Sequence, residues 1–382
     1  MEVFTPPSAL YQLENQAVIR KRRNSNLELY RIIVMLLIVA HHYVVNSGLI
    51  EMIRESPVTP SSWAMIVFGA WGKTGINCFV LITGYFMCRS TFTWEKLLKL
   101  YLQIILYAVV IFGIFCVTGH ESFSIFKSAF KLFPVKGVDK GFTSCFIVFF
   151  LFIPFINRLI SVMNRREHTY LTLLLLAVYT ILPSLHFNVS FNYVTWFFAI
   201  YMTASFIRIY GFKWQISHKT WGWLSLSFLV TSTISVLTLF GLYKYEYIGV
   251  WAPYYLISDS NKILALMLSV ASFMWFKDLK IPHSRFINAI GATTFGVLLI
   301  HANSDAMRQW LWRETVDCMG HFSESVLWTL GYSVASVLVI FVVCSGIDWF
   351  RGRYIEPPLI NLVKETGLKI HKKVHRLSWK SV

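Results

Sequence analysis

One apolar segment near the start of the chain carries Glu28, Arg31 and His42 on a helical spacing. If the segment is a helix, the step from Arg31 to His42 makes three turns and about 20°, so both side chains project from one face, roughly 16 Å apart along the axis. Glu28 lies on the same face and can orient the Arg31 guanidinium by pairing with it. Because histidine titrates near neutral pH, His42 is a candidate general base.

Simpler explanations for these residues stay open at this point. Arg31 can bind an anionic donor, form a structural ion pair, or reach the membrane surface as a snorkelling arginine. His42 can instead serve as a structural hydrogen bonder between helices. Lys73 lies inside the next apolar segment, where it either snorkels or faces the bundle interior or a water-filled cavity.

Only three of the eleven histidines fall within apolar segments, namely His41, His42 and His301. His301 sits at a depth similar to that of His42, so we expect the two imidazoles to share one site. His41 projects about 100° away from His42 and is the weaker candidate. The six cysteines are scattered without the spacing of metal ligands, so we expect neither a metal site nor a disulfide framework.

The composition is that of a membrane protein. Hydrophobic residues make up 56% of the 382 residues and charged residues 14%, and the mean hydropathy is +0.56. Soluble proteins carry about 25% charged residues. The net charge of +16 does not indicate nucleic-acid binding, because the basic residues lie mostly in short loops and tails, where they face an anionic inner leaflet. No signal peptide is expected, since residues 1–26 are largely polar.

Windows of about twenty residues predict an all-α, polytopic bundle of about ten transmembrane helices. The predicted spans are Leu29–Gly48, Trp63–Met87, Leu97–Thr118, Phe142–Met163, Thr169–Leu185, Asn192–Tyr210, Trp221–Tyr243, Leu256–Phe276, Phe286–Asn303 and Val326–Phe350. The eighth is the weakest, because Asp259 and Lys262 intrude at its start. Residues 28–350 then form one transmembrane domain between basic cytoplasmic segments at 1–27 and 351–382.

The distribution of Lys and Arg predicts that both ends of the chain are cytoplasmic. With the N-terminus inside, the inner segments hold 24 of the 35 basic residues and the outer loops nine, Arg308 among them. On the outer side, Glu121–Phe133 has phenylalanines at helical spacing and predicts an amphipathic interfacial helix. The outer loop Tyr243–Tyr255 is aromatic, which favours an interfacial belt over a sugar-stacking surface.

Two further motifs follow the first span. The second span ends in the run Phe79-Val-Leu-Ile-Thr-Gly-Tyr85, which contains Thr83, and the third span opens with Lys96 and Lys99 on one helix face. The first span also carries an arginine and a histidine separated by ten residues, Arg31 and His42, and a further motif surrounds His301. Together, these motifs resemble the acyltransferase 3 family of integral-membrane acyltransferases. The resemblance covers Leu29–Phe350. The chain departs from the family pattern at Asn77, where many members have aspartate, and at both lysines, where arginines are usual.

The resemblance implies an O-acyltransferase that moves an acyl group, usually acetyl, from cytoplasmic acyl-CoA to a hydroxyl of a bacterial cell-surface or lipid-linked glycan. It implies a multi-pass protein of the inner (plasma) membrane that binds acyl-CoA as a co-substrate and holds no resident cofactor. His42, Arg31 and Glu28 would be catalytic, with His42 acting as base or carrying the acyl group transiently. The expected substrate-binding residues are Lys73, Thr83, Tyr85, Lys96, Lys99 and His301.

A protein of another class is also compatible with the residues. Ten spans with buried cations can form a transporter or flippase for a sugar, lipid or organic acid, with Arg31 and Lys73 binding an anionic substrate. Inverted halves with broken helices in corresponding positions are not evident in the sequence, which disfavours this alternative. A protein with a purely structural role in an assembly is the least favoured class. The burial of histidines and a lysine would then cost free energy without serving a function. The acyl group, the acceptor and the oligomeric state are left open.

Overall fold

The computed structural model describes residues 23–126, 129, 132–133, 135, 138, 141–190, 192–212 and 216–366, and within them it is helical without strands. The predicted helix Glu121–Phe133 falls partly outside these residues. The helices are α2 Ser25–Val45, α3 Leu49–Glu55, α4 Pro60–Phe68, α5 Gly72–Met87, α6 Trp94–Val117, α8 Phe142–Val162, α9 Arg165–Leu176, α10 Leu182–Ser184, α11 Tyr193–Ile209, α12 His218–Lys244, α13 Ile263–Lys277, α14 Arg285–His301, α15 Asp305–Gln309 and α16 Val326–Phe350. Three π-helical turns extend them, η1 Ala177–Ile181, η2 Trp310–Thr315 and η3 Arg351–Ile355.

Most helices begin at a residue that supplies a cap. Hydroxyl or amide side chains accept hydrogen bonds from first-turn N–H groups, which have no partner inside the helix. Asn164 forms a reciprocal capping box with Glu167 at the start of α9. The other side-chain caps are Thr59, Thr93, Asn192, Ser217, Ser284, Ser304 and Ser325. Gly141, which precedes α8, has no side chain to offer.

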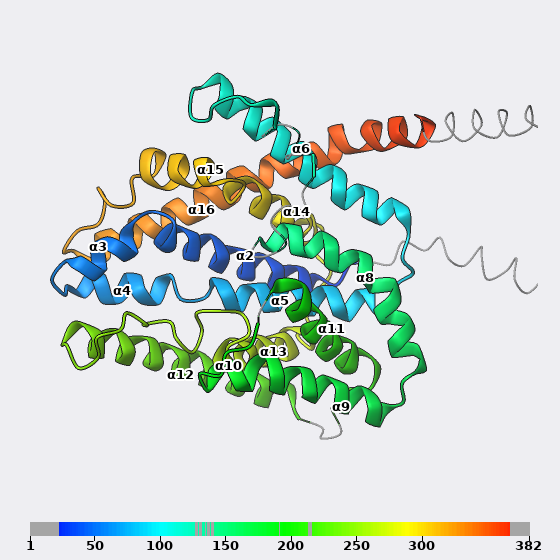
Figure 1. Cartoon of the computed structure of the whole chain (residues 1–382), viewed down its shortest axis with the longest axis horizontal. Coiled ribbons are helices and arrows are strands. Elements are labelled where there is room, and N and C mark those ends of the chain that lie inside the picture. Colours follow the sequence, from blue (N-terminus) through cyan, green and yellow to red (C-terminus); the bar gives the residue numbers. More distant parts are fainter. Residues whose placement is uncertain are drawn as a thin grey trace, which may run out of the picture.

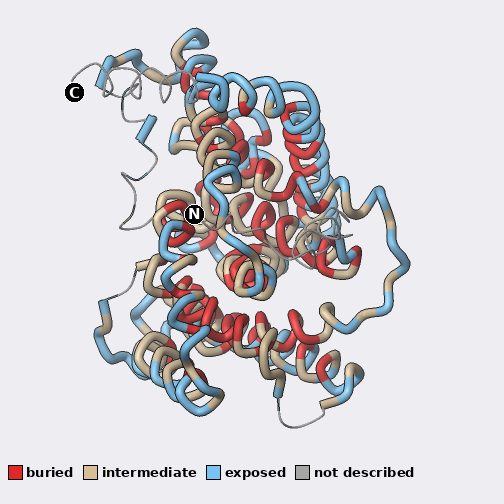
Figure 2. The backbone as a smooth tube through the Cα atoms, turned by 90° about the vertical axis from the view of Figure 1, so that its right-hand side faces the viewer, coloured by how far each residue is buried: buried red, intermediate tan, exposed pale blue. Residues whose placement is uncertain are grey.

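The helices run roughly along the long axis of the molecule (Figure 1), and α2 lies at the centre of the packing. It packs against α14 and α16 on one side and against α5 on the other. Beyond α5 follow α11 and α13, and α12 covers α13. Viewed nearly along the helices, the buried stretches face the interior and the exposed ones the periphery (Figure 2).

Each of the ten predicted spans overlaps a helix, and six helical segments in the described residues are long and apolar enough to cross a membrane. A seventh candidate is the pair formed by Arg285–His301 and Asp305–Thr315, which is bent by 97°. The helices α11 and α13 are apolar but shorter, with 17 and 15 residues. The chain is therefore a multi-pass membrane protein, whereas the number of ten crossings and the orientation stay predictions.

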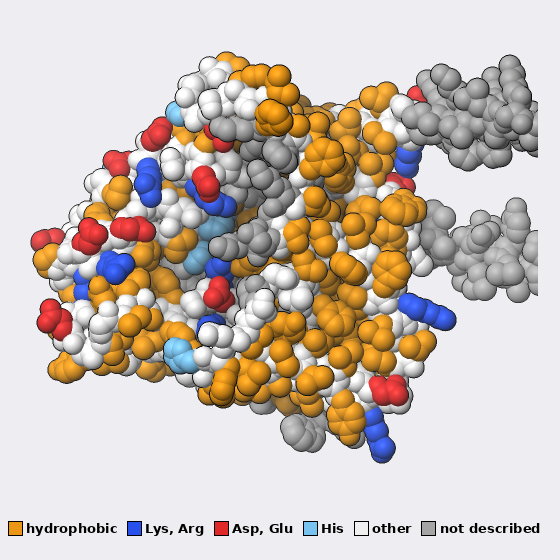
Figure 3. Space-filling model, viewed as in Figure 1, with side chains coloured by type: hydrophobic (Ala, Val, Ile, Leu, Met, Phe, Trp, Pro, Cys, Tyr) orange, Lys and Arg blue, Asp and Glu red, His pale blue; other side chains and the backbone are white. Residues whose placement is uncertain are grey.

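Hydrophobic side chains cover the middle and right of the bundle in Figure 3, and charged side chains gather at the left. The hydrophobic part extends to the side where α2 and α6 begin, and a few charged side chains border it there. The charged part lies where α2 ends and α3 and α15 follow. This distribution agrees with a bundle whose apolar flank contacts lipid and whose opposite end reaches water.

Two glycines of α14 let buried carboxylates approach its backbone. A Cβ on Gly291 would lie 2.5 Å from Glu28 Oε2, and one on Gly296 would lie 2.1 Å from Asp348 Cγ. Asp348 Oδ1 accepts hydrogen bonds from Gln103, Tyr107 and Arg351, at 3.0, 2.8 and 2.8 Å. The carboxylate is thus fixed from several sides, and it cannot move away to make room for a larger residue.

We therefore expect Gly296→Ala to lower the free energy of unfolding by about 1–3 kcal/mol, the usual cost of overpacking a well-packed interior. Thermal unfolding in detergent measures the effect as a lower midpoint temperature. Gly346→Ala is the matched control, because a Cβ at that position of α16 meets no atom within 4 Å. Equal midpoints for the two variants would contradict the prediction.

Candidate functional site

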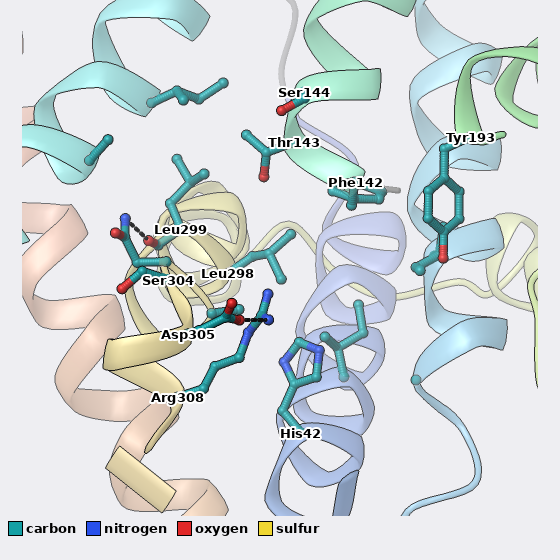
Figure 4. A pocket seen from close by; sticks show the side chains of 18 of the residues that line it. His42, Phe142, Thr143, Ser144, Tyr193, Leu298, Leu299, Ser304, Asp305 and Arg308 are labelled. Atoms are coloured by element: carbon teal, nitrogen blue, oxygen red, sulfur yellow. Dashed lines mark hydrogen bonds and ion pairs between the residues drawn. The ribbon is translucent and has the colours of Figure 1, made fainter. Parts of the chain in front are cut away.

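A cavity of about 800 Å³ opens beside the centre of α2. Its walls come from α2, α5, α6, α8, α11, α14 and α15, so segments far apart in sequence meet there (Figure 4). The polar side chains that line it are His41, His42, Lys73, Glu121, Thr143, Ser144, Tyr193, Asn303, Ser304, Asp305 and Arg308. Its size is that of a pocket for a small organic ligand.

A chain of hydrogen bonds fixes the proton positions of two imidazoles. His301 Nδ1 lies 2.6 Å from the carbonyl oxygen of Val297, and His301 Nε2 lies 2.9 Å from His42 Nδ1. A carbonyl can only accept, so His301 Nδ1 carries a proton. With both rings neutral, His301 Nε2 then accepts from His42 Nδ1–H, which leaves His42 Nε2 as the unprotonated nitrogen. The expectation that His42 and His301 share one site agrees with this contact.

The two rings differ in their access to the cavity. His301 is fully buried, behind His42 as seen from the cavity. His42 lines the cavity, and its ring and the Arg308 guanidinium point toward the same space (Figure 4). His301 is therefore placed to support His42, and His42 is placed to meet a substrate.

His41 is a second imidazole at the cavity. Its Nδ1 donates to the carbonyl oxygen of Gly69 at 2.6 Å, so the neutral ring also leaves Nε2 unprotonated. The ring centres of His41 and His42 are 5.7 Å apart. Helical geometry made His41 the weaker candidate, but a direct comparison of the two residues is needed because both line the cavity.

Two cations complete the polar lining. Lys73 Nζ donates to the Tyr193 hydroxyl at 3.0 Å, which holds the ammonium inside the bundle at the cavity. Arg308 pairs with Asp305 at 2.7 Å, and Arg308 Nε is buried without a hydrogen-bond partner in the described part of the chain. Both side chains can therefore offer N–H groups to a negatively charged or strongly polar atom in the cavity.

The predicted topology placed Arg308 in an outer loop, and no role was predicted for this residue. The chain turns by 97° after α14, and this turn directs α15 back over the cavity. A local signal for a short helix was present in Ser304, whose side chain caps α15 at Met307 N–H. The direction of the turn is a tertiary feature that this signal does not contain.

The predicted ion pair at the start of α2 is present. Arg31 NH1 lies 3.1 Å and 3.3 Å from the two carboxylate oxygens of Glu28, and Arg23 approaches the same carboxylate at 3.3 Å. Met35, one turn further along the helix, lines the cavity together with His42. Along the α2 axis, Arg31 is therefore about 6 Å from Met35, the nearest cavity-lining residue on the same face of the helix.

Thr83 and Tyr85 do not line the cavity. The Thr83 hydroxyl donates to the Phe79 carbonyl within α5. Tyr85 accepts a hydrogen bond from Arg208 at 2.8 Å, and the guanidinium lies over its ring. The Tyr85 contacts tie α5 to α11, and a role of either residue in substrate binding stays a prediction.

Lys96 and Lys99 also lie away from the cavity, at the beginning of α6. Lys96 Nζ donates to Ser90 and to the Thr91 carbonyl, and Lys99 pairs with Glu95 at 3.1 Å. The starts of α2 and α6 are at the same end of the molecule (Figure 1). Both lysines thus share that end with Arg31, but they have protein partners of their own.

Asn77, at the position where the family often has aspartate, is fully buried. Its amide donates to the Ser260 carbonyl at 2.6 Å and accepts from Trp196 Nε1 at 2.8 Å. This side chain joins α5 to α11 and to the segment that precedes α13. Its contacts are those of a structural link.

The fold and the site together define a multi-pass helical membrane protein with a histidine pair at the edge of an internal cavity. Residues 24–345 match the family model described as an acyltransferase domain. The chain belongs to the acyltransferase 3 family, which confirms the resemblance found in the sequence motifs, and it is a membrane acyltransferase. Searches among curated proteins and among solved structures found no match.

We expect His301→Phe to lower kcat for acyl transfer by about 10²- to 10⁴-fold, because the variant removes the acceptor that fixes the proton on His42 Nδ1. Initial rates with a radiolabelled acyl donor measure the effect. His168→Phe is the control, since His168 is equally buried but bonds to the Met202 carbonyl from α9, away from the cavity. A His301→Phe protein with more than half of the wild-type rate would contradict the assignment.

Proposed function

We propose that the protein is an O-acyltransferase that moves an acyl group, acetyl in the first instance, from cytoplasmic acyl-CoA to a hydroxyl of a cell-surface or lipid-linked glycan. One observation carries the proposal. An unprotonated imidazole nitrogen, fixed by a second imidazole, faces a cavity and lies on the same helix face as the half-buried Arg31. The family supplies the reaction class, and this arrangement supplies a base and a route to it.

In the proposed reaction, His42 Nε2 removes the proton of the acceptor hydroxyl as its oxygen attacks the thioester carbonyl. The new C–O bond forms and the C–S bond breaks, and the proton passes from His42 to the leaving CoA thiolate. His301 accepts the Nδ1–H throughout, which stabilises the transient imidazolium. A variant of this route, with the acyl group carried briefly on His42, uses the same nitrogen as nucleophile.

The donor would enter from the end where α2 begins. Arg31, held by Glu28, would meet its phosphates, and Lys96 and Lys99 would contribute from the start of α6. The pantetheine arm would then follow the α2 stripe toward His42, over roughly 16 Å. This direction assumes the predicted orientation, with both chain ends in the cytoplasm and the protein in the inner (plasma) membrane.

Negative charge develops on the thioester oxygen when the hydroxyl attacks. Lys73 and Arg308 reach the cavity from α5 and α15 and are the cations available for that charge or for the acceptor. Such prearranged donors act strongly in a site with little water. The cavity therefore contains a base and electrophilic groups within one volume.

The first experiment compares two variants that are matched in shape. His42→Asn and His41→Asn both keep an N–H donor near the Nδ1 position, and both delete the Nε2 that faces the cavity. We expect His42→Asn to lower transfer from radiolabelled acetyl-CoA to surface polysaccharide by about 10³-fold or more, and His41→Asn to stay within about threefold of wild type. Membranes with equal amounts of each protein are incubated with donor and glycan, and the retained label is counted.

Two outcomes would contradict this prediction. If His41→Asn is the inactive variant, His41 is the base. If the wild type transfers no label from acetyl-CoA or longer acyl-CoA donors, yet changes the movement of a glycan precursor or organic acid across the membrane, the transporter alternative replaces the proposal.

The donor route has its own pair of variants, because Arg31 and Arg23 contact the same carboxylate. We expect Arg31→Gln to raise KM for acyl-CoA by about tenfold or more through the loss of a charge-assisted contact to phosphate. Arg23→Gln, at the more exposed position, should change KM little. Steady-state kinetics with varied acyl-CoA measure both, and equal KM values would exclude Arg31 from donor binding.

A further inference from the structure

A second hollow, of about 450 Å³, lies between the loop after α10 and the segment before α13. The residues that matter in its wall are Pro183, His186, Asn188, Tyr255, Asp259 and Lys262. None of them lines the first cavity. The mechanism proposed above makes no use of this hollow.

Its most distinctive feature is a stacked pair of rings. The rings of His186 and Tyr255 lie 4.5 Å apart at an interplanar angle of 16°. Tyr255 is held in place by its hydroxyl, which donates to the Pro183 carbonyl, and by Lys262, whose ammonium lies 4.4 Å from the ring centre. His186 is exposed, so the pair presents a flat ring surface at the hollow.

Polar groups surround this flat surface. The Asp259 carboxylate and the Asn188 amide lie in the wall, and neither side chain makes a hydrogen bond to any residue that the structure describes. Together they offer acceptors and a donor beside an aromatic face. A sugar ring has the complementary chemistry, since it exposes C–H groups on its faces and hydroxyls at its edge. A phosphate or a fatty chain would use only part of this surface.

The hollow is close to the first cavity. Asp259 is near enough to interact electrostatically with Lys73, which lines the first cavity. Ser190 lines the hollow and Tyr193 lines the first cavity, and a three-residue step covers at most about 11 Å between Cα atoms. A short oligosaccharide can therefore reach from one to the other.

We propose that this hollow is a second saccharide subsite, which binds a sugar unit of the acceptor next to the unit that is acylated at His42. The acceptor is then an oligosaccharide or longer glycan, and not a single sugar. The inference rests on the proposed function, because it extends the acceptor that this function names. The ring pair supports the face of the bound unit, and Asp259 and Asn188 hold its hydroxyls.

The test uses His186→Asn and Asp259→Asn. His186 has a φ of 67°, a left-handed conformation that asparagine tolerates better than most residues, so the variant removes the ring without straining the loop. Asp259→Asn keeps the size of the side chain and replaces one acceptor by a donor. The matched control is His321→Asn, because the His321 ring stacks on Tyr332 at 3.9 Å but lines neither cavity.

The probes are saccharides from partial acid hydrolysis of de-O-acylated surface polysaccharide of the source organism, sorted into single sugars, disaccharides and longer fragments. Binding to the purified protein in detergent is followed by saturation-transfer NMR, and transfer from radiolabelled acetyl-CoA gives kcat and KM. We expect wild-type KM to be about tenfold lower for fragments than for single sugars. Both variants should raise KM for fragments by about fivefold or more, with kcat and the single-sugar reaction nearly unchanged. His321→Asn should match wild type.

The subsite is overturned if wild type uses single sugars and fragments equally well, or if the variants weaken both to the same degree. If acyl transfer occurs with a KM that does not depend on the length of the saccharide, the subsite is overturned and the proposed function stands. Binding of fragments that depends on His186, without transfer from any acyl-CoA, supports the subsite and overturns the proposed function. If the protein neither binds nor acylates any fraction, both are overturned.

Discussion

The hydrogen bond between His42 and His301 is the contact on which the proposed chemistry depends. It joins α2 to α14, and it has chemical meaning only while His301 keeps its own bond to the Val297 carbonyl. A small shift of α2 relative to α14 would break this series of hydrogen bonds, and the proton on His42 Nδ1 would lose its acceptor. Sites that depend on such geometry need their supporting elements fixed to within about 0.5 Å. The helix α14 packs against α2, α16 and α6, which supply this support.

Buried charges supply part of that fixation. Glu28 pairs with Arg31 on α2, and Asp348 pairs with Arg351 at the end of α16, and both carboxylates lie against glycines of α14. An unpaired charge inside an apolar bundle is costly, and each of these carboxylates is paired with an arginine of its own helical segment. The helix that carries His301 is held from two sides by the close approach of Gly291 to Glu28 and of Gly296 to Asp348, and by apolar packing.

The periodicity of the sequence predicted part of the fold and part of the site, but not all of either. Hydropathy located a helix at every predicted span, and helical spacing anticipated the Glu28–Arg31 pair, because both signals are local. The same signals placed Arg308 in a loop and did not reveal the contacts of Asp348, since the turn after α14 and the meeting of α6 with α16 are tertiary events. The span predicted at Leu256–Phe276 begins as a helix only at Ile263. Apolar composition alone does not distinguish a membrane helix from a loop that folds back into the bundle.

The short helices have a consequence for how the protein responds to its bilayer. At 1.5 Å per residue, α11 and α13 are about 26 Å and about 23 Å long, less than the roughly 30 Å of a hydrocarbon core. Most of α11 is buried, whereas α6, α12 and α16 are mostly half-buried or exposed. Hydrophobic mismatch therefore acts on the peripheral helices, which can tilt or recruit thicker lipid, and it acts little on α11. The wall that α11 supplies to the cavity is in this way less sensitive to membrane thickness than the wall that α6 supplies.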